Sequence, residues 1–119
     1  MSRSFRDLTV WQRAMQLTIS IYRLTATFPK EEQYGLTNQL RRAAVSIPSN
    51  IAEGQGRSSS REFGQFLSIA RGSLCELQTQ LEIARLLEYG STAKIKEADE
   101  LSHEVGKMIF SFQETLKDQ

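Results

Sequence analysis

The sequence is poor in the residues that form disulfides, metal sites and catalytic centres. Its 119 residues include one cysteine, Cys75, and one histidine, His103. A single thiol cannot form a disulfide within the chain, and one histidine with one cysteine gives too few ligands for a His/Cys metal site. The Gly-x-Ser-x-Gly motif of serine hydrolases is also missing. We therefore predict a protein that is not an enzyme and uses no metal or cofactor.

Long apolar runs and strand-like alternation are missing as well. No segment reaches the roughly 20 apolar residues that span a membrane. No apolar stretch follows Arg3 and Arg6 as it would in a signal peptide. Together with the single cysteine, these absences predict a cytoplasmic protein that does not contact membranes. The lack of alternating polar and apolar residues excludes β-strands.

Apolar residues instead recur at three- and four-residue spacing, which is the period of an amphipathic helix. The two prolines and seven glycines lie mostly at the junctions between these periodic segments. The junctions are short, which favours antiparallel neighbours. The sequence therefore predicts an all-α fold, a single antiparallel up-down four-helix bundle over residues 1–119. The predicted helices span about residues 8–26, 36–54, 59–88 and 91–116.

The second predicted helix has a proline in its interior. Pro48 removes the amide that would bond the Ala44 carbonyl and clashes with that turn, at a cost of about 3 kcal/mol. Short polar side chains around it, Ser46, Ser49 and Asn50, are expected to bond the freed backbone. The sequence therefore predicts a proline-kinked second helix.

The residues that follow this proline are interpreted as structural. Asn50 is expected to bond backbone, and Glu53 to bond an arginine. Neither has a partner that would activate it as a general base. Gly54 and Gly56 are expected to adopt the left-handed conformation that ends the helix. Pro48, Asn50, Glu53 and Gly54 thus form a candidate structural motif.

The first predicted helix is apolar on two opposite faces. One face carries Leu8, Trp11, Met15, Ile19 and Tyr22, and the other carries Val10, Ala14, Leu17, Ile21, Leu24 and Phe28. A helix with two apolar faces needs two partners. Either the helix is wedged between two others of its own chain, or one face contacts a neighbouring subunit. On the second interpretation the candidate oligomer interface consists of Val10, Leu17, Ile21 and Leu24.

The charge is nearly balanced overall but unevenly distributed. The net charge is +1, yet residues 1–61 carry +5 and residues 62–119 carry −4. Such asymmetry marks either a nucleic-acid-facing end or two surfaces of opposite sign that dock in a bundle or an oligomer. The isoelectric point of about 7.9 favours docking, because dedicated nucleic-acid binders are usually more basic.

Five arginines are the candidate nucleic-acid contacts. The planar guanidinium fork of arginine suits phosphate or carboxylate groups. Self-assembly would multiply weak phosphate contacts. Alternatively, Glu53 and Glu62 pair with these arginines and hold the junction between the second and third helices. The five candidates are Arg41, Arg42, Arg57, Arg61 and Arg71.

Several short motifs resemble a known family. They are Leu8-Thr9-Val10-Trp11-Gln12, Phe28-Pro29, Glu32, Gly35-Leu36, the run Gln39 to Gly54, Gly56-Arg57, Glu62-Phe63, Phe66-Leu67, Ile69-Ala70, Gly72-Ser73-Leu74 and Glu76-Leu77. The segment from Ser46 to Gly54 is the most specific of them. The chain resembles the small bacterial proteins encoded by intervening sequences of 23S rRNA genes, also labelled S23 ribosomal proteins.

The resemblance implies a four-helix bundle that assembles as a ring-shaped homopentamer and has no established enzymatic activity. The accessory protein of diversity-generating retroelements, which binds a reverse transcriptase and nucleic acid, is similar to this family. We therefore predict a self-assembling bundle that binds RNA, another nucleic acid or a ribonucleoprotein. The alternative is a protein-interaction scaffold with no nucleic-acid role.

Overall fold

The computed structural model describes residues 4–118, which form four α-helices and two short 3₁₀-helices without any strand. This confirms the all-α prediction. Each α-helix begins and ends within two residues of its expected bounds. The α-helices are α1 (Thr9–Thr25), α2 (Leu36–Gln55), α3 (Ser60–Leu86) and α4 (Thr92–Lys117), and the 3₁₀-helices are η1 (Phe5–Asp7) and η2 (Lys30–Glu32).

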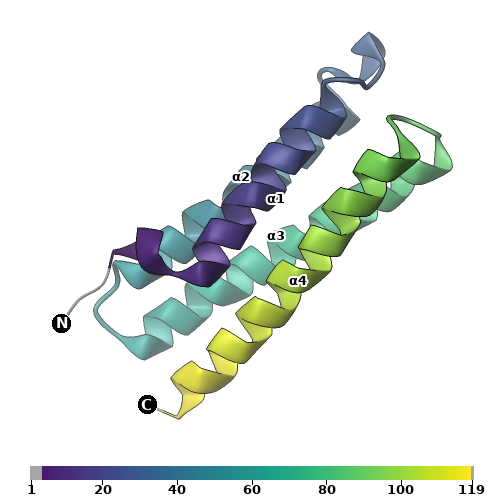
Figure 1. The fold of residues 1–119 in the computed structure, drawn as a ribbon. Coiled ribbons are helices and arrows are strands. Elements are labelled where there is room, and N and C mark those ends of the chain that lie inside the picture. The colour runs from purple at the N-terminus through teal and green to yellow at the C-terminus, as the bar shows by residue number, and fades with distance from the viewer. Residues whose placement is uncertain (1–3, 119) are drawn as a thin grey trace.

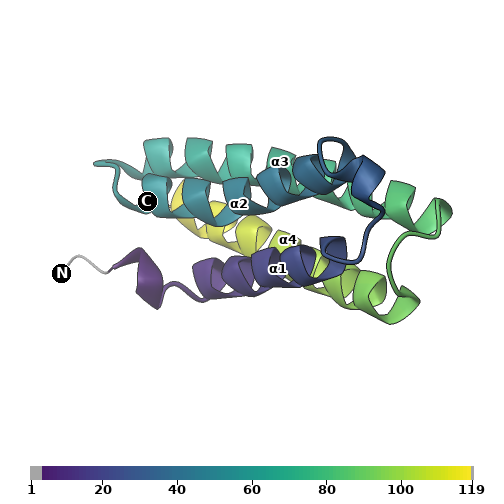
Figure 2. The same cartoon turned by 90° about the horizontal axis from the view of Figure 1, so that it is seen from above.

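The four α-helices lie side by side, and each packs against two neighbours (Figures 1 and 2). Both α1 and α3 contact α2 and α4. Side-chain hydrogen bonds between α3 and α4 join Arg71 to Gln113 and Gln78 to Ser102. In Figure 1, α1 begins and α4 ends at the same end of the molecule. None of the helices described is long and apolar enough to cross a membrane.

The core is built from one face of each helix, and on α1 it is the face that was assigned to a neighbouring subunit. That assignment is wrong for all four candidate residues, which are buried within the chain: Val10, Leu17, Ile21 and Leu24. On the opposite face, Met15, Ile19 and Tyr22 are 37%, 46% and 40% exposed. Periodicity shows that both faces are apolar, but it does not show which one α2 and α4 cover.

Pro48 lies buried inside α2, which continues past it. The Ala44 carbonyl, which has no amide partner because of the proline, accepts a hydrogen bond from Thr18 Oγ1 at 3.1 Å. The freed carbonyl is therefore satisfied by a neighbouring helix, and not by the polar residues around the proline as expected. Asn50 Nδ2 instead donates to the Ser46 carbonyl at 2.8 Å.

Gly54 has a role other than the expected one. It lies within α2 and is buried, so it does not end the helix in a left-handed conformation. A Cβ atom at this position would lie 2.8 Å from Phe63 Cδ1 and 2.8 Å from Phe66 Cβ. The glycine therefore allows α2 and α3 to approach closely near the turn that joins them.

Gly54→Ala should lower the free energy of unfolding by about 1–3 kcal/mol, because the added methyl group overpacks the contact between α2 and α3. Gly72→Ala is the matched control, since a Cβ there meets no atom within 4 Å. Alanine is the better helix former, so the control should gain roughly 0.5–1 kcal/mol. Urea unfolding followed by circular dichroism measures both. Equal changes in the two variants would contradict this role for Gly54.

Candidate nucleic-acid interface

The five candidate arginines do not form one patch. Arg41 and Arg57 lie roughly 20 Å apart along the direction of α2, given a rise of 1.5 Å per residue. Arg41 Nε donates to Thr25 Oγ1 at 2.8 Å, and its guanidinium lies 4.6 Å from the centre of the Tyr22 ring. Arg41 therefore joins α2 to α1. Arg42 is exposed and forms no hydrogen bond or ion pair with the described residues.

Arg57 braces the junction between α2 and α3. Its Nη2 atom lies 3.0 Å from Glu53 Oε1, and its guanidinium lies 4.7 Å from the centre of the Phe66 ring. This is the bracing role expected for Glu53, although such an exposed pair contributes only about 0–1 kcal/mol. Glu62 forms no ion pair with an arginine among residues 4–118. The Arg57 guanidinium thus already contacts an acidic and an aromatic side chain of its own chain.

Arg61 and Arg71 line a hollow of about 490 Å³ between α3 and α4. Phe110 and Lys117 reach this hollow from α4. A second hollow of about 560 Å³ shares Arg71 and Phe110 with the first and adds Lys107. The shared residues join the two hollows into one feature. We call it the α3–α4 groove and define it by Arg61, Arg71, Lys107, Phe110 and Lys117.

The α3–α4 groove is basic. Four lysine or arginine side chains line it, whereas Glu114 is the single carboxylate among its described lining residues. Glu114 lies 3.1 Å from Lys117 Nζ. Arg61 and Lys107 form no ion pair or hydrogen bond with the described residues, so their charges are open to an external anion. This excess of positive charge suits a phosphate backbone.

An aromatic ring and fixed polar groups accompany these charges. Phe110 is 54% exposed and lies where the two hollows meet. Arg71 Nη1 donates to Gln113 Oε1 at 3.3 Å, and Gln113 Nε2 donates to Ser68 Oγ at 3.0 Å. These bonds orient Arg71 toward the groove. An exposed ring beside cationic side chains is the combination that binds unstacked bases and their phosphates.

Sequence reasoning found the α3 wall of the groove but missed its α4 wall. Lys107, Phe110, Glu114 and Lys117 are three or four residues apart, so they lie along one edge of α4. That spacing was the available signal. It was overlooked because alternating charges on a helix usually indicate a solvated face, and because the core stripe of the same helix gave a stronger pattern.

No group of three or more His, Cys, Asp and Glu side chains among residues 4–118 could hold a metal ion. Cys75 is exposed, and His103 Nε2 lies 3.5 Å from Asp99 Oδ1 on the surface of α4. Within residues 4–118 the lone imidazole therefore pairs with a carboxylate and not with the lone thiol.

Residues 6–111 match the family described as 23S rRNA-intervening sequence protein. The chain belongs to this family. The match confirms the resemblance inferred from the sequence motifs and covers most of the four helices.

A solved structure from Bacteroides thetaiotaomicron has the same fold as this chain. It is a protein with unknown function from the S23 ribosomal protein family, with a TM-score of 0.79 and 22% sequence identity. The alignment covers 88% of the present chain and 98% of the Bacteroides chain. At this identity the similarity shows the fold alone. No curated protein matches the sequence at a significant level.

Proposed function

We propose that this protein is a non-enzymatic, self-assembling bundle that binds nucleic acid, RNA above all, through the α3–α4 groove. The bundle is antiparallel, with α2 bent at Pro48, and it assembles as a homopentameric ring in the bacterial cytoplasm. An exposed free cysteine, Cys75, is compatible with that reducing compartment. Family membership supports the association with rRNA genes, and the ring is what the resemblance to that family implies.

The observation that carries the binding function is the composition of the α3–α4 groove. Its two unpaired cations, Arg61 and Lys107, flank the exposed Phe110, while Arg71 is held in place by Gln113. A duplex hides its bases, whereas a single strand or a loop offers both bases and phosphates. The groove therefore fits single-stranded RNA or the loop of a structured RNA.

Assembly would strengthen this binding. One groove neutralises only a few phosphates, which gives weak affinity by itself. A ring of identical chains offers several grooves to one RNA, and binding at the first raises the effective concentration at the next. Self-assembly and nucleic-acid binding thus support each other in the proposed function.

A salt titration tests the proposal. Binding of a fluorescent single-stranded RNA, followed by anisotropy, should weaken steeply as salt rises, because each neutralised phosphate releases condensed counterions. A contact with three or four phosphates gives a slope of roughly −2 to −3 in a plot of log K against log salt. A duplex of the same length is the control and should bind less tightly. Absence of RNA and DNA binding at low salt would overturn the proposal and favour a protein-interaction scaffold.

A further inference from the structure

His103 continues the row of side chains that α4 presents to the α3–α4 groove. It lies four residues before Lys107, which lies three before Phe110, so the three side chains share one edge of the helix. All three line the second hollow of the groove, of about 560 Å³. Arg71 reaches the same hollow from α3. The one histidine of the sequence therefore lies beside two cations and an exposed ring.

The charged groups that the neighbouring helices contribute to this hollow are cationic. Helix α4 packs against α3 and α1. From α3, Arg71 is the titratable group in the hollow, whereas α1 contributes none of the described lining residues. On its α1 side, α4 carries Glu104, which already pairs with Arg13 at 2.7 Å. The described residues that line the hollow thus include two cations besides His103 and no carboxylate.

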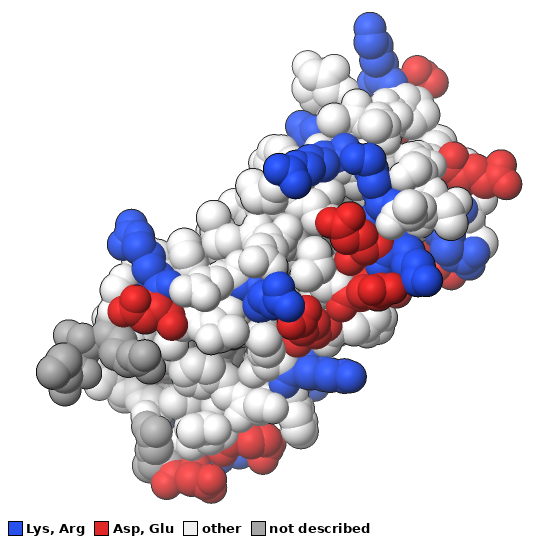
Figure 3. All heavy atoms as spheres, viewed as in Figure 1, with Lys and Arg blue, Asp and Glu red and all other residues white. Residues whose placement is uncertain are grey.

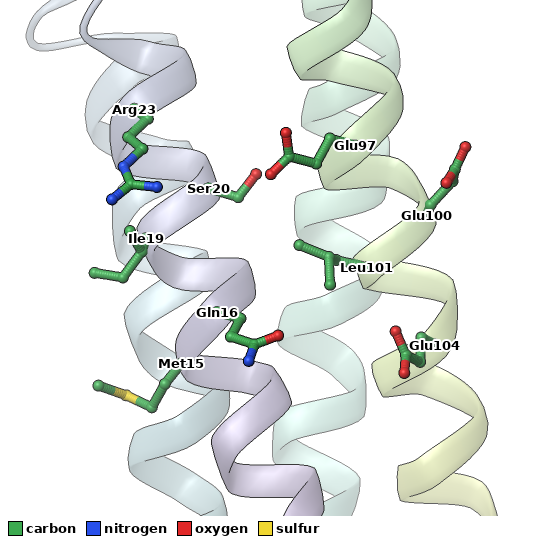
Figure 4. A pocket seen from close by; sticks show the side chains of 9 residues that line it. All are labelled: Met15, Gln16, Ile19, Ser20, Arg23, Glu97, Glu100, Leu101 and Glu104. Atoms are coloured by element: carbon green, nitrogen blue, oxygen red, sulfur yellow. The ribbon is translucent and has the colours of Figure 1, made fainter.

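Two carboxylates of α4 itself lie one turn before His103. Asp99 Oδ1 is 3.5 Å from His103 Nε2, and both side chains are at least half exposed, so this pair is weak. Glu100 lies three residues before His103, and its side chain points away from α1 (Figure 4). On the face drawn in Figure 3, acidic and basic side chains lie next to one another. The second hollow differs from that face in its excess of cations.

One ring nitrogen of His103 is open to a ligand. Nε2 faces Asp99, whereas Nδ1 forms no hydrogen bond with residues 4–118. A neutral imidazole carries one N–H group, but the protonated ring carries an N–H group on each nitrogen. Protonation therefore adds a positive charge to the groove and gives the ring a donor for an external anion, while the other nitrogen keeps its contact with Asp99.

We infer that His103 is the pH-dependent phosphate contact of the α3–α4 groove, where its protonated ring joins Arg71 and Lys107 at a phosphate of the RNA. Arg71 uses one of its N–H groups on Gln113 and keeps the others for this phosphate. Histidine changes its charge between about pH 5 and 8, so RNA binding tightens as the pH falls through this range. The inference rests on the RNA binding stated in the proposed function and adds a means of regulating it.

The proton and the RNA favour each other's binding at this hollow. A bound phosphate places a negative charge beside the ring, and an opposite charge at this range stabilises the protonated form. Because the coupling between two ligands is reciprocal, an RNA that binds more tightly at low pH also causes the protein to take up a proton. One more phosphate contact to a single strand steepens the salt slope by roughly 0.7, which is about a fivefold gain in affinity near 0.1 M salt.

Anisotropy titrations with a short oligouridylate at about pH 7.5 and about pH 5.5 test this role, because histidine gains its proton between these values and uracil does not. Wild-type protein should bind about fivefold more tightly at the lower pH. His103→Gln should bind at both values as the wild type does at the higher one. His103→Lys is charged at both and should bind as the wild type does at the lower one. Ser49→Lys is the matched control, since it adds the same charge at an exposed site of α2 outside the groove, and it should keep the wild-type affinities.

The outcomes separate this inference from the proposed function. Absence of binding at both pH values overturns RNA binding by the groove, and the role of His103 with it. Equal wild-type affinities at the two values, or a His103→Gln variant that keeps the pH dependence, overturn only the role of His103. A Ser49→Lys variant that binds as tightly as His103→Lys does so too, because net charge would then set the affinity. Calorimetry in two buffers of different ionisation enthalpy should detect proton uptake when the wild type binds RNA, and none with His103→Gln.

Discussion

Leu17→Glu is expected to unfold the protein, not merely to separate its subunits. Leu17 has no exposed surface and lies in the core formed by the four helices. Truncation of Leu17 to alanine alone lowers the free energy of unfolding by about 2–5 kcal/mol. A buried carboxylate without a partner lowers it further. Because a domain of this kind is stable by about 5–15 kcal/mol, the glutamate variant should lose its cooperative thermal transition. Circular dichroism during heating measures this.

The control for Leu17→Glu lies two residues further along the same helix. Ile19→Glu introduces the same charge on the opposite face of α1, and it should keep helicity and a cooperative transition. Leu17→Ala completes the series and should melt lower than wild type while remaining folded. A Leu17→Glu protein that melts near the wild-type temperature as a single chain would show that the core does not use this face.

The contrast between the two faces of α1 shows how far sequence reasoning extends. The period of apolar residues fixed the number of helices and their ends to within two residues, because side-chain periodicity and capping are local properties. It also showed that α1 has two apolar faces. Which face is covered depends on how α2 and α4 pack against α1, and no local pattern contains that information. The assignment of Leu17 and Ile21 to a subunit contact failed for this reason.

Pro48 and Gly54 show the same limit at single positions. The sequence showed that the Ala44 carbonyl loses its partner, since that follows from the chemistry of proline. It did not show that Thr18 supplies the replacement, because Thr18 lies on another helix. Likewise, glycine near the end of a helix usually ends it. The close approach of Phe63 and Phe66 to Gly54 is a tertiary contact that the α2 sequence does not contain.

The candidate interface was predicted in part. Arg61 and Arg71 were chosen for their chemistry, and the structure places both on the α3–α4 groove. Arg41 and Arg57 have the same chemistry, but the Arg41 guanidinium already packs on the Tyr22 ring and Arg57 already pairs with Glu53. Chemistry identifies residues able to bind phosphate; only packing separates those that are open to a ligand from those that are already engaged.

Neutralising the α3–α4 groove should remove most of the RNA affinity. In the triple variant Arg61→Gln, Arg71→Gln and Lys107→Gln, three candidate phosphate contacts per chain are lost. The salt slope should become shallower by about 2, since each contact to a single strand contributes roughly 0.7. Affinity near 0.1 M salt should fall roughly 100-fold on the same grounds. Anisotropy titrations at several salt concentrations measure both quantities.

A matched variant distinguishes RNA binding at the α3–α4 groove from binding that depends only on the net charge of the protein. Arg23→Gln with Arg42→Gln removes two exposed cations outside the groove and should leave the salt slope almost unchanged. Phe110→Ala removes the exposed ring without changing charge. It should weaken binding of single strands by about 1–3 kcal/mol for each base stacked and keep the wild-type slope. If the control pair flattened the slope as much as the triple variant, binding would follow overall charge, and the α3–α4 groove would not be the interface.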